Sequence, residues 1–286
     1  MDKRKSWLAI IGVLMITLLS GCVQAIPSIA PEGRQGRIAA VYLGQKSKDF
    51  AQAFLEGAQT YSEQQEATVQ LQLITSPEQL SEEVDIVVTS REEANAFASS
   101  ELLLLEESEA GAKALGREIG RQLLQDLQER GAEIPQVYFL GNGESEDWQI
   151  VLYEEICKGF AQNGKTEEPQ KKTVLQQQIA QWLEEHQGEI AVVAVDEQMA
   201  LDLQQSAVEA GRQHEISIFS LEYSREIERA IRAALIYGAL LENPIQMGEN
   251  TVRKFRQEVI MEPGRVIICR KNLDLPEIKT LRTFSE

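Results

Sequence analysis

The sequence predicts an α/β fold with two lobes. Short apolar runs of strand length alternate along the chain with stretches that have the apolar spacing of helices, as in layered folds built on parallel sheets. A long helical stretch from about Glu109 to Arg130, which Gly131 ends, separates two such series. Two successive α/β series joined by a few crossings predict two lobes with a cleft between them.

The first series predicts a lobe built on four strands. These strands are expected at residues 37–43, 69–74, 84–88 and 102–105. After the first strand, apolar residues recur at helical spacing from Phe50 to Tyr61. Brief helices are expected at residues 78–82 and 92–97.

The second series predicts a larger lobe. Apolar runs that suit strands lie at residues 136–140, 173–175, 190–195, 216–219, 237–241 and 266–269. Helical spacing is found at residues 148–162, 177–186, 198–210, 225–234 and 247–257. Ligands of such folds collect at the carboxyl ends of the strands, so we expect binding residues there.

The N-terminal segment predicts a secretion signal. Lys3, Arg4 and Lys5 precede an apolar run from Trp7 to Leu19. A basic start, a short apolar run and small residues are typical of a signal peptide. The run is shorter than the roughly 20 apolar residues that cross a bilayer, so we do not expect a membrane-spanning helix.

The end of this signal predicts a lipid anchor. The apolar run ends in Leu19-Ser20-Gly21-Cys22, and small residues before a cysteine resemble the lipobox of bacterial lipoproteins. The resemblance implies removal of residues 1–21, lipidation of Cys22 and a place on the extracytoplasmic face of the cell membrane. The alternative is an ordinary signal peptide with an incidental cysteine. Residues 22–36 have little periodicity and contain Pro and Gly, so they predict a linker.

The charge of the chain argues against nucleic acid as a partner. The net charge is −17, and the predicted signal contributes +2, so the rest of the chain carries −19. Nucleic acid requires a basic surface. The same acidity argues against a body that lies flat on anionic lipid.

No metal or cofactor site is expected. The chain has two histidines, and they do not combine with cysteines at metal-ligand spacing. Cys157 lies in a helical pattern and Cys269 in a strand-like run, and we expect two buried, unpaired thiols. A disulfide stays an alternative outside the cytosol.

Three segments of the sequence resemble one family. Ile190 to Gly211 contains Val-Ala-Val-Asp196-Glu197-Gln-Met-Ala, Tyr237 to Gly248 contains Glu242-Asn-Pro-Ile-Gln-Met-Gly, and the third segment is Asp49 to Gly57. In this order and spacing they resemble type I periplasmic binding proteins, specifically the sugar-binding lipoproteins of ABC transporters. The resemblance implies two Rossmann-like lobes with parallel sheets that close on a ligand at a hinge. Lobe one would comprise residues 37–107 and 243–263, lobe two residues 108–242 and 264–275, with a C-terminal tail at 276–286.

The candidate ligand residues depart from the family pattern. Where the family has Asn and Asp after the strand at 190–195, this chain has Asp196 and Glu197. The residues at three further ligand or hinge positions are Lys48, Glu222 and Glu242, and Ile156 replaces an Arg of the family. Phe50 is the one aromatic residue that is kept. The segment from 88 to 102 is short, so lobe one looks trimmed.

These departures leave two hypotheses for the cleft. The site residues Lys48, Phe50, Trp148, Asp196, Glu197, Glu222 and Glu242 could hold a sugar-like or amine-bearing ligand, with Phe50 as a cation–π face. Alternatively, the cleft has lost its ligand and the carboxylates point to solvent. Trp148 could line the cleft or pack at the start of a helix.

The corresponding functions are two. One is a solute-binding lipoprotein that delivers its ligand to an ABC permease. The other is an interaction or sensory lipoprotein with a membrane sensor as partner. An enzyme is not expected, because adjacent carboxylates such as Asp196 and Glu197 seldom face one another across a substrate.

Overall fold

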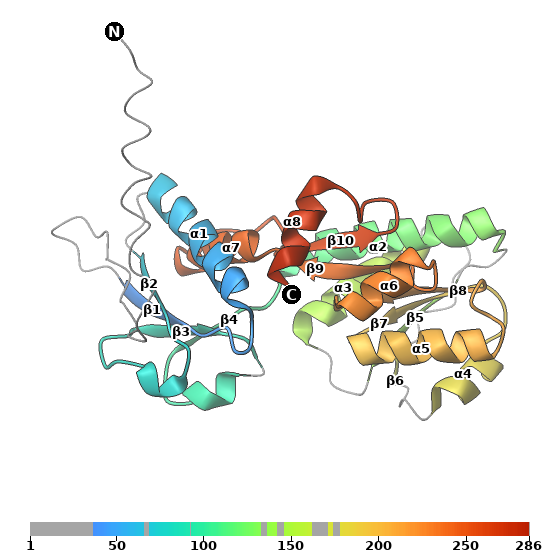
Figure 1. Cartoon of the computed structure of the whole chain (residues 1–286), viewed down its shortest axis with the longest axis horizontal. Coiled ribbons are helices and arrows are strands. Elements are labelled where there is room, and N and C mark those ends of the chain that lie inside the picture. Colours follow the sequence, from blue (N-terminus) through green and yellow to red (C-terminus); the bar gives the residue numbers. More distant parts are fainter. Residues whose placement is uncertain are drawn as a thin grey trace, which may run out of the picture.

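Two α/β lobes lie side by side in the computed structural model of the chain (Figure 1), which describes residues 37–65, 69–91, 93–132, 136–141, 146–161, 171–173 and 178–285. The predicted signal, Cys22 and the predicted linker lie outside these residues. Within the described residues, no helix combines the length and the apolar character needed to cross a bilayer. The predicted α/β fold with two lobes is confirmed.

Lobe one is built on a parallel sheet of four strands in the order β2-β1-β3-β4. The strands are β1 (Arg37–Val41), β2 (Val69–Leu73), β3 (Ile86–Thr89) and β4 (Leu102–Leu104). Successive side chains of a strand point to opposite faces, so Ala39 and Val41 join one core and Ala40 the other. Helices α1 (Lys48–Gln64) and α7 (Pro244–Phe255) cover the first face of the sheet. The short helices η1 (Pro77–Gln79) and η2 (Ala94–Phe97) lie on the other face.

Two glycines let α1 and α7 touch backbone to backbone. A Cβ on Gly57 would collide with the Ile245 carbonyl, and a Cβ on Gly248 would collide with the Phe54 carbonyl. Only glycine permits so close an approach. Lobe one is therefore completed by a helix that comes from near the end of the chain.

Lobe two is built on a sheet of six strands in the order β10-β9-β8-β7-β5-β6. The strands are β5 (Gln136–Gly141), β6 (Lys171–Thr173), β7 (Ile190–Ala194), β8 (Ile216–Ser220), β9 (Gly238–Glu242) and β10 (Arg265–Cys269). Strand β10 runs antiparallel to β9, which the sequence does not predict. It does so because the chain leaves lobe two at the carboxyl end of β9 and returns from lobe one at that same end, where Arg265 pairs with Glu242.

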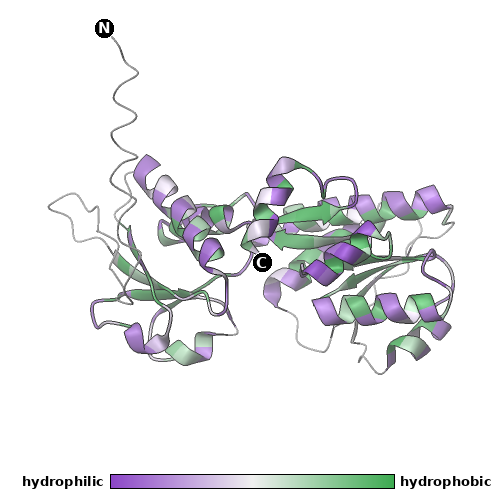
Figure 2. Ribbon diagram, in the orientation of Figure 1, coloured by the Kyte–Doolittle hydropathy of each residue, from purple (hydrophilic) through white to green (hydrophobic). Residues whose placement is uncertain are grey.

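Two layers of helices cover this sheet, and the apolar residues gather between layers (Figure 2). Helices α2 (Glu109–Arg130) and α3 (Asp147–Ala161) pack on one face. The other face carries α4 (Ile179–Glu185), α5 (Glu197–Glu209), α6 (Arg225–Arg232) and α8 (Pro276–Phe284). Cys157 and Cys269 are buried and unpaired, as predicted.

Helix α8 lies between the two lobes. Ile278 and Leu281 are buried in the core of lobe two, while Phe284 packs against the cores of both lobes. The Ser47 hydroxyl, just before α1, donates a hydrogen bond of 2.9 Å to the Phe284 carbonyl. The C-terminal segment, for which the sequence suggests a tail, is thus a helix that contacts both lobes.

Candidate functional site

The carboxyl ends of the two sheets face one another where the lobes meet. Lys46, in the loop after β1, forms an ion pair of 2.5 Å with Glu242 at the end of β9. Arg91, which follows β3, lies 3.8 Å from the Asp147 carboxylate at the start of α3. Both pairs join a residue of lobe one to a residue of lobe two. The predicted location of binding residues is therefore also the place where the lobes touch.

The two facing edges differ in their balance of charge. Lobe one presents the cations Lys46, Lys48 and Arg91 together with carboxylates, among them Glu93 beside Gly44 and Glu106, which pairs with Arg91 at 2.5 Å. Lobe two presents five carboxylates, which are Asp147, Asp196, Glu197, Glu222 and Glu242. Opposite charges attract, and between these edges the attraction is realised in the pairs Lys46–Glu242 and Arg91–Asp147.

Three of the predicted carboxylates meet at the start of α5. The Asp196 carboxylate accepts a 2.7 Å hydrogen bond from the Met199 amide, and the Glu222 carboxylate accepts a 3.0 Å bond from the Glu197 amide. The first turn of a helix has unpaired amides and a partial positive charge, which stabilise nearby anions. Two of the three carboxylates thus cap α5, and their mutual repulsion is relieved by the helix.

Lys48 and Glu197 are charged side chains on the facing edges that lack an internal partner in the described part of the chain. Neither the Lys48 ammonium nor the Glu197 carboxylate has a hydrogen-bond or ion-pair partner among the described residues. Lys48 is exposed on lobe one and Glu197 is half-buried on lobe two. Both groups are therefore available to a ligand without loss of an internal contact.

The Phe50 ring lies inside lobe one. It is 1% exposed and packs in the core under α1. The Lys46 ammonium lies 5.2 Å from the ring centroid, over the ring. A cation of the chain itself thus occupies the place that a cationic ligand would take.

Trp148 is covered in the same way. Its ring is 5% exposed, and the Arg265 guanidinium lies over it, 4.5 Å from the centroid. Arg265 also lies 3.8 Å from the Glu242 carboxylate. Trp148 and Glu242 are therefore brought together by a residue that the sequence did not single out.

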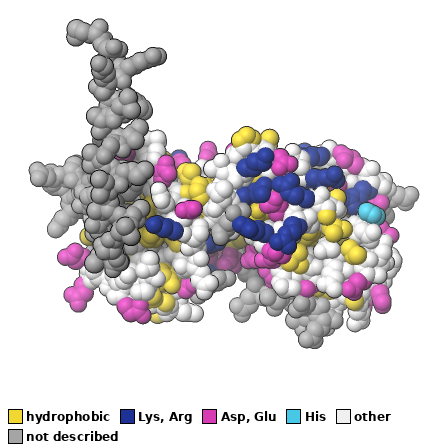
Figure 3. Space-filling view, in the orientation of Figure 1, with side chains coloured by type: hydrophobic (Ala, Val, Ile, Leu, Met, Phe, Trp, Pro, Cys, Tyr) yellow, Lys and Arg dark blue, Asp and Glu magenta, His cyan; other side chains and the backbone are white. Residues whose placement is uncertain are grey.

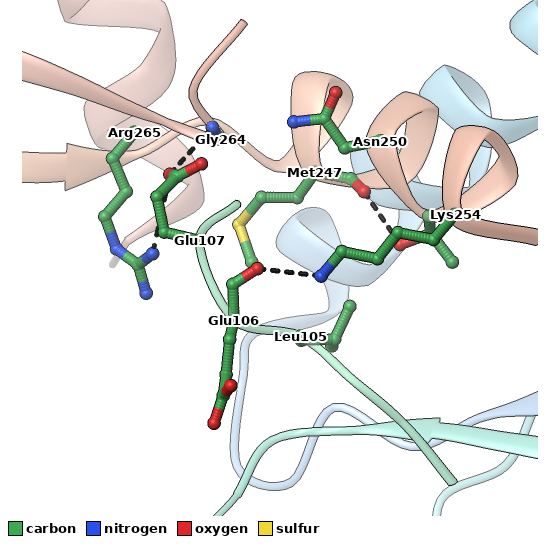
Figure 4. Close-up of a pocket in the computed structure, with 9 residues that line it drawn as sticks. Leu105, Glu106, Glu107, Met247, Asn250, Lys254, Gly264 and Arg265 are labelled. Carbon is green, nitrogen blue, oxygen red and sulfur yellow. Dashed lines mark hydrogen bonds and ion pairs between the residues drawn. The ribbon is translucent and has the colours of Figure 1, made fainter. Parts of the chain in front are cut away.

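The connections between the lobes enclose a small cluster of buried charges (Figure 4). The Glu107 side chain is 1% exposed and lies 3.7 Å from the Arg265 guanidinium. Its carboxylate accepts hydrogen bonds from the Ser108 amide at 3.0 Å and the Gly264 amide at 2.9 Å. Burial raises the pKa of Glu107, against the opposing effect of Arg265 and of these amides. Because residues 105–108 and 256–264 both connect the lobes, Glu107 ties one connection to another.

Lys254 of α7 contributes the third charge of this cluster. Its ammonium donates to the Leu104 carbonyl at 3.0 Å and to the Glu106 carbonyl at 2.9 Å, so it secures the end of β4. Burial lowers the pKa of Lys254. The cavity beside these residues measures about 20 Å³, which is room for about one water molecule and not for a sugar.

A chain of charged contacts runs from the edge of lobe one to these connections. It passes from Lys46 through Glu242 and Arg265 to Glu107. The sequence predicted one of these four residues, because only Glu242 lies in a segment that resembles the family. No group of three or more possible metal ligands occurs within the described ranges.

Comparison with known proteins gives matches among solved structures alone. No family model matches the sequence, and no curated protein matches it. A protein from Brachyspira murdochii, described as an ABC transporter, LacI family transcriptional regulator, is 14% identical with a TM-score of 0.57, over 86% of this chain and 98% of that one. An ABC transporter solute-binding protein from Agrobacterium vitis, bound to α-D-tagatopyranose, is 13% identical with a TM-score of 0.56, over 86% and 98%.

A third solved structure is a complex of two proteins, XylFII–LytSN. Its matched chain is 10% identical with a TM-score of 0.51, and the match covers 83% of this chain and 99% of that one. Identities this low carry information on the fold. Together with the two sheets and the connections described above, they show that the chain has the fold of the type I periplasmic binding proteins, as its sequence predicts.

Proposed function

We propose that this chain is an extracytoplasmic solute-binding protein, lipid-anchored through Cys22, that captures a small ligand between its lobes for an ABC permease. The observation that carries the proposal is that the carboxyl ends of both sheets face one another across the contact between the lobes. In open α/β folds this is where ligands bind. A ligand that bridges the edges would favour the closed arrangement of the lobes.

The free side chains suggest what the ligand carries. Lys48 and Glu197 offer a cation from lobe one and an anion from lobe two. Hydroxyls and amines bind such groups through charge-assisted hydrogen bonds. A sugar-like or amine-bearing ligand suits them, although it would lack an exposed aromatic plane, since Phe50 and Trp148 are both covered.

A thermal-shift panel of sugars, amines and nucleosides tests this function. A true ligand at 100 times its Kd stabilises the folded protein by about 2.7 kcal/mol, which raises Tm by several degrees. We expect Glu197→Gln and Lys48→Gln each to weaken the binding of the hit about tenfold. Glu154→Gln, an exposed carboxylate on α3, is the matched control and should bind normally. A well-folded protein that responds to no compound would contradict capture of a solute.

A sensory or interaction module is the second candidate, and one observation favours it. The pairs Lys46–Glu242 and Arg91–Asp147 are contacts of the chain with itself between the facing edges, where a solute would otherwise make them. The similarity to a chain of the XylFII–LytSN complex agrees with a protein partner. Affinity capture from solubilised membranes separates the candidates: permease subunits support transport, whereas a sensor kinase supports signalling. Neither candidate includes catalysis.

A further inference from the structure

One face of this acidic protein is basic. Helices α6 and α8 lie next to each other on the sheet of lobe two, and the turn after β10 continues their surface. We call this surface the α6–α8 face. It carries the cations Arg225, Arg229, Arg232, Arg270, Lys271, Lys279 and Arg282 and the carboxylates Glu226, Glu228, Asp274 and Glu277. Its net charge is +3, which leaves −22 on the remainder of the chain after the predicted signal.

The fold itself produces this concentration. Glu228 of α6 is buried between the two helices, where it lies 2.8 Å from the Arg282 guanidinium and accepts a 2.9 Å hydrogen bond from Arg232. The Tyr223 hydroxyl donates to it at 2.7 Å. This buried carboxylate joins the two helices and holds Arg232 and Arg282 at their junction. Figure 3 shows the resulting group of Lys and Arg side chains over lobe two.

The exposed cations of the α6–α8 face can exchange the carboxylates with which they form ion pairs for other anions. Arg229 is 72% exposed and pairs with exposed Glu226, and Lys279 is 57% exposed at 3.8 Å from exposed Asp274. Arg270 and Lys271 are exposed at the end of β10. Exposed pairs of this kind contribute little stability, so phosphate groups could replace the carboxylates. Arginine is well suited to this because its planar guanidinium binds phosphate through two hydrogen bonds.

We propose that the α6–α8 face docks on the phosphate headgroups of an anionic lipid surface. The partner follows from the anchor in the function proposed above, which keeps the body within reach of a membrane. A tether raises the effective concentration of the surface, so that weak contacts suffice, and a lipid anchor combined with a basic patch is a recurrent pair of signals. The net acidity of the chain argues against a body that lies on anionic lipid, but it does not exclude contact through this one face, because screening limits the effect of the remaining charge to about 8 Å at physiological salt.

Docking would give the protein a fixed orientation. The acidic faces of lobe two would turn away from the membrane. Helix α8, which contacts both lobes, would lie at the lipid surface.

Vesicle co-sedimentation tests this proposal. The probe is a vesicle of equal parts phosphatidylglycerol and phosphatidylcholine at about 100 mM salt, where the Debye length is about 10 Å. The protein is the chain from residue 22 onward with Cys22→Ser, so that no lipid is attached. We expect it to bind these vesicles, to bind pure phosphatidylcholine far less, and to dissociate as the salt concentration rises.

A pair of charge-matched variants locates the contact. The triple variant Arg270→Glu, Lys271→Glu and Lys279→Glu should weaken binding at least about tenfold. The control Lys113→Glu, Arg121→Glu and Lys158→Glu makes the same change of charge on α2 and α3, the opposite face of the sheet, and should bind as the parent does. Melting curves verify that both variants fold, and the salt dependence of the parent serves as an independent measurement.

Three outcomes would overturn the proposal. They are no binding of the parent to anionic vesicles, equal losses in the two triple variants, or binding of soluble polyglutamate without binding of vesicles, which would assign the face to an acidic protein. None of these outcomes bears on capture of a solute, which the thermal-shift panel measures in the absence of lipid.

Discussion

The lobe connections and the start of α5 both gather charged residues at the edge of a sheet, yet they differ in what surrounds the charge. At the connections, Glu107 is almost fully buried and is held by Arg265 and by two backbone amides. At α5, Asp196 and Glu222 lie nearer the solvent and accept bonds from the first turn of a helix. The first group holds the lobes together, whereas the second leaves Glu197 free. Burial therefore separates a structural cluster from a candidate binding edge that has the same residue types.

Removal of the Arg265 side chain should lower the stability of the protein more than any other change predicted below. Arg265→Ala leaves Glu107 buried without its cation and uncovers Trp148, and loss of one partner of a buried pair is costly. We expect the free energy of unfolding to fall by about 2 to 3 kcal/mol, measured by urea denaturation. Arg121→Ala, at an exposed pair on α2, should change it by less than about 0.5 kcal/mol. Equal effects of the two variants would show that the buried cluster does not hold the lobes.

The pH dependence of stability should report Glu107. Its pKa in the folded protein lies above the ordinary value of 4.5 because the carboxylate is buried. The folded state therefore binds the proton more tightly than the unfolded state, and the resulting stabilisation is complete below pH 4.5 and is lost as the pH rises through the raised pKa.

Glu107→Gln should remove this loss of stability above pH 4.5. The variant would give a flatter curve of unfolding free energy against pH than the parent. Glu154→Gln on the surface of α3 should keep the slope of the parent. An unchanged slope in Glu107→Gln would mean that another group dominates the titration.

The hydrogen bond from the Met199 amide to Asp196, which caps α5, should contribute less to stability than the contacts of Arg265. Asp196→Ala removes the acceptor for the Met199 amide, which typically costs about 1 kcal/mol. Asp196→Asn keeps an oxygen acceptor and should recover most of the loss in a thermal melt. If Asn restores nothing, the negative charge rather than the hydrogen bond is what α5 requires.

The ion pair between Lys46 of lobe one and Glu242 of lobe two should contribute least to stability. Lys46 is 46% exposed and Glu242 is 25% exposed, so Lys46→Ala should cost less than about 1 kcal/mol. Its expected effect is on shape, because an ion pair between the facing edges is lost. Small-angle scattering should show a larger radius of gyration, and an unchanged radius would indicate that the connections alone set the angle between the lobes.

Local patterns predicted most of the fold. Buried strands such as β7 are continuous apolar runs, and Asp196 stands at the turn where the sequence predicts the start of a helix. The antiparallel direction of β10 depends on where the chain returns from lobe one, which no local pattern records. Helix α8 was missed because its few apolar residues, Ile278, Leu281 and Phe284, serve two cores.

The candidate site could be predicted only in part. The sequence places Asp196, Glu197 and Glu222 after neighbouring strands, and parallel strands bring such residues to one edge. For Phe50 two arguments conflict: the apolar spacing from Phe50 to Tyr61 predicts that the ring faces the core, as it does, whereas the resemblance implies a ring exposed to ligand. The partners Lys46, Arg265 and Glu107 come from three distant segments, and their contacts exist only once both lobes have formed.

The close contact of α1 with α7 also dictates an order of events during synthesis. Residues 37–64 emerge early, but the helix that covers them spans 244–255. Until then the glycine-lined side of α1 and the apolar face of its sheet have no cover. Such long-range contacts slow folding and leave apolar surface open to aggregation. The sheet of lobe one should therefore stay uncovered until nearly the whole chain has been made, although its first strand and helix are made early.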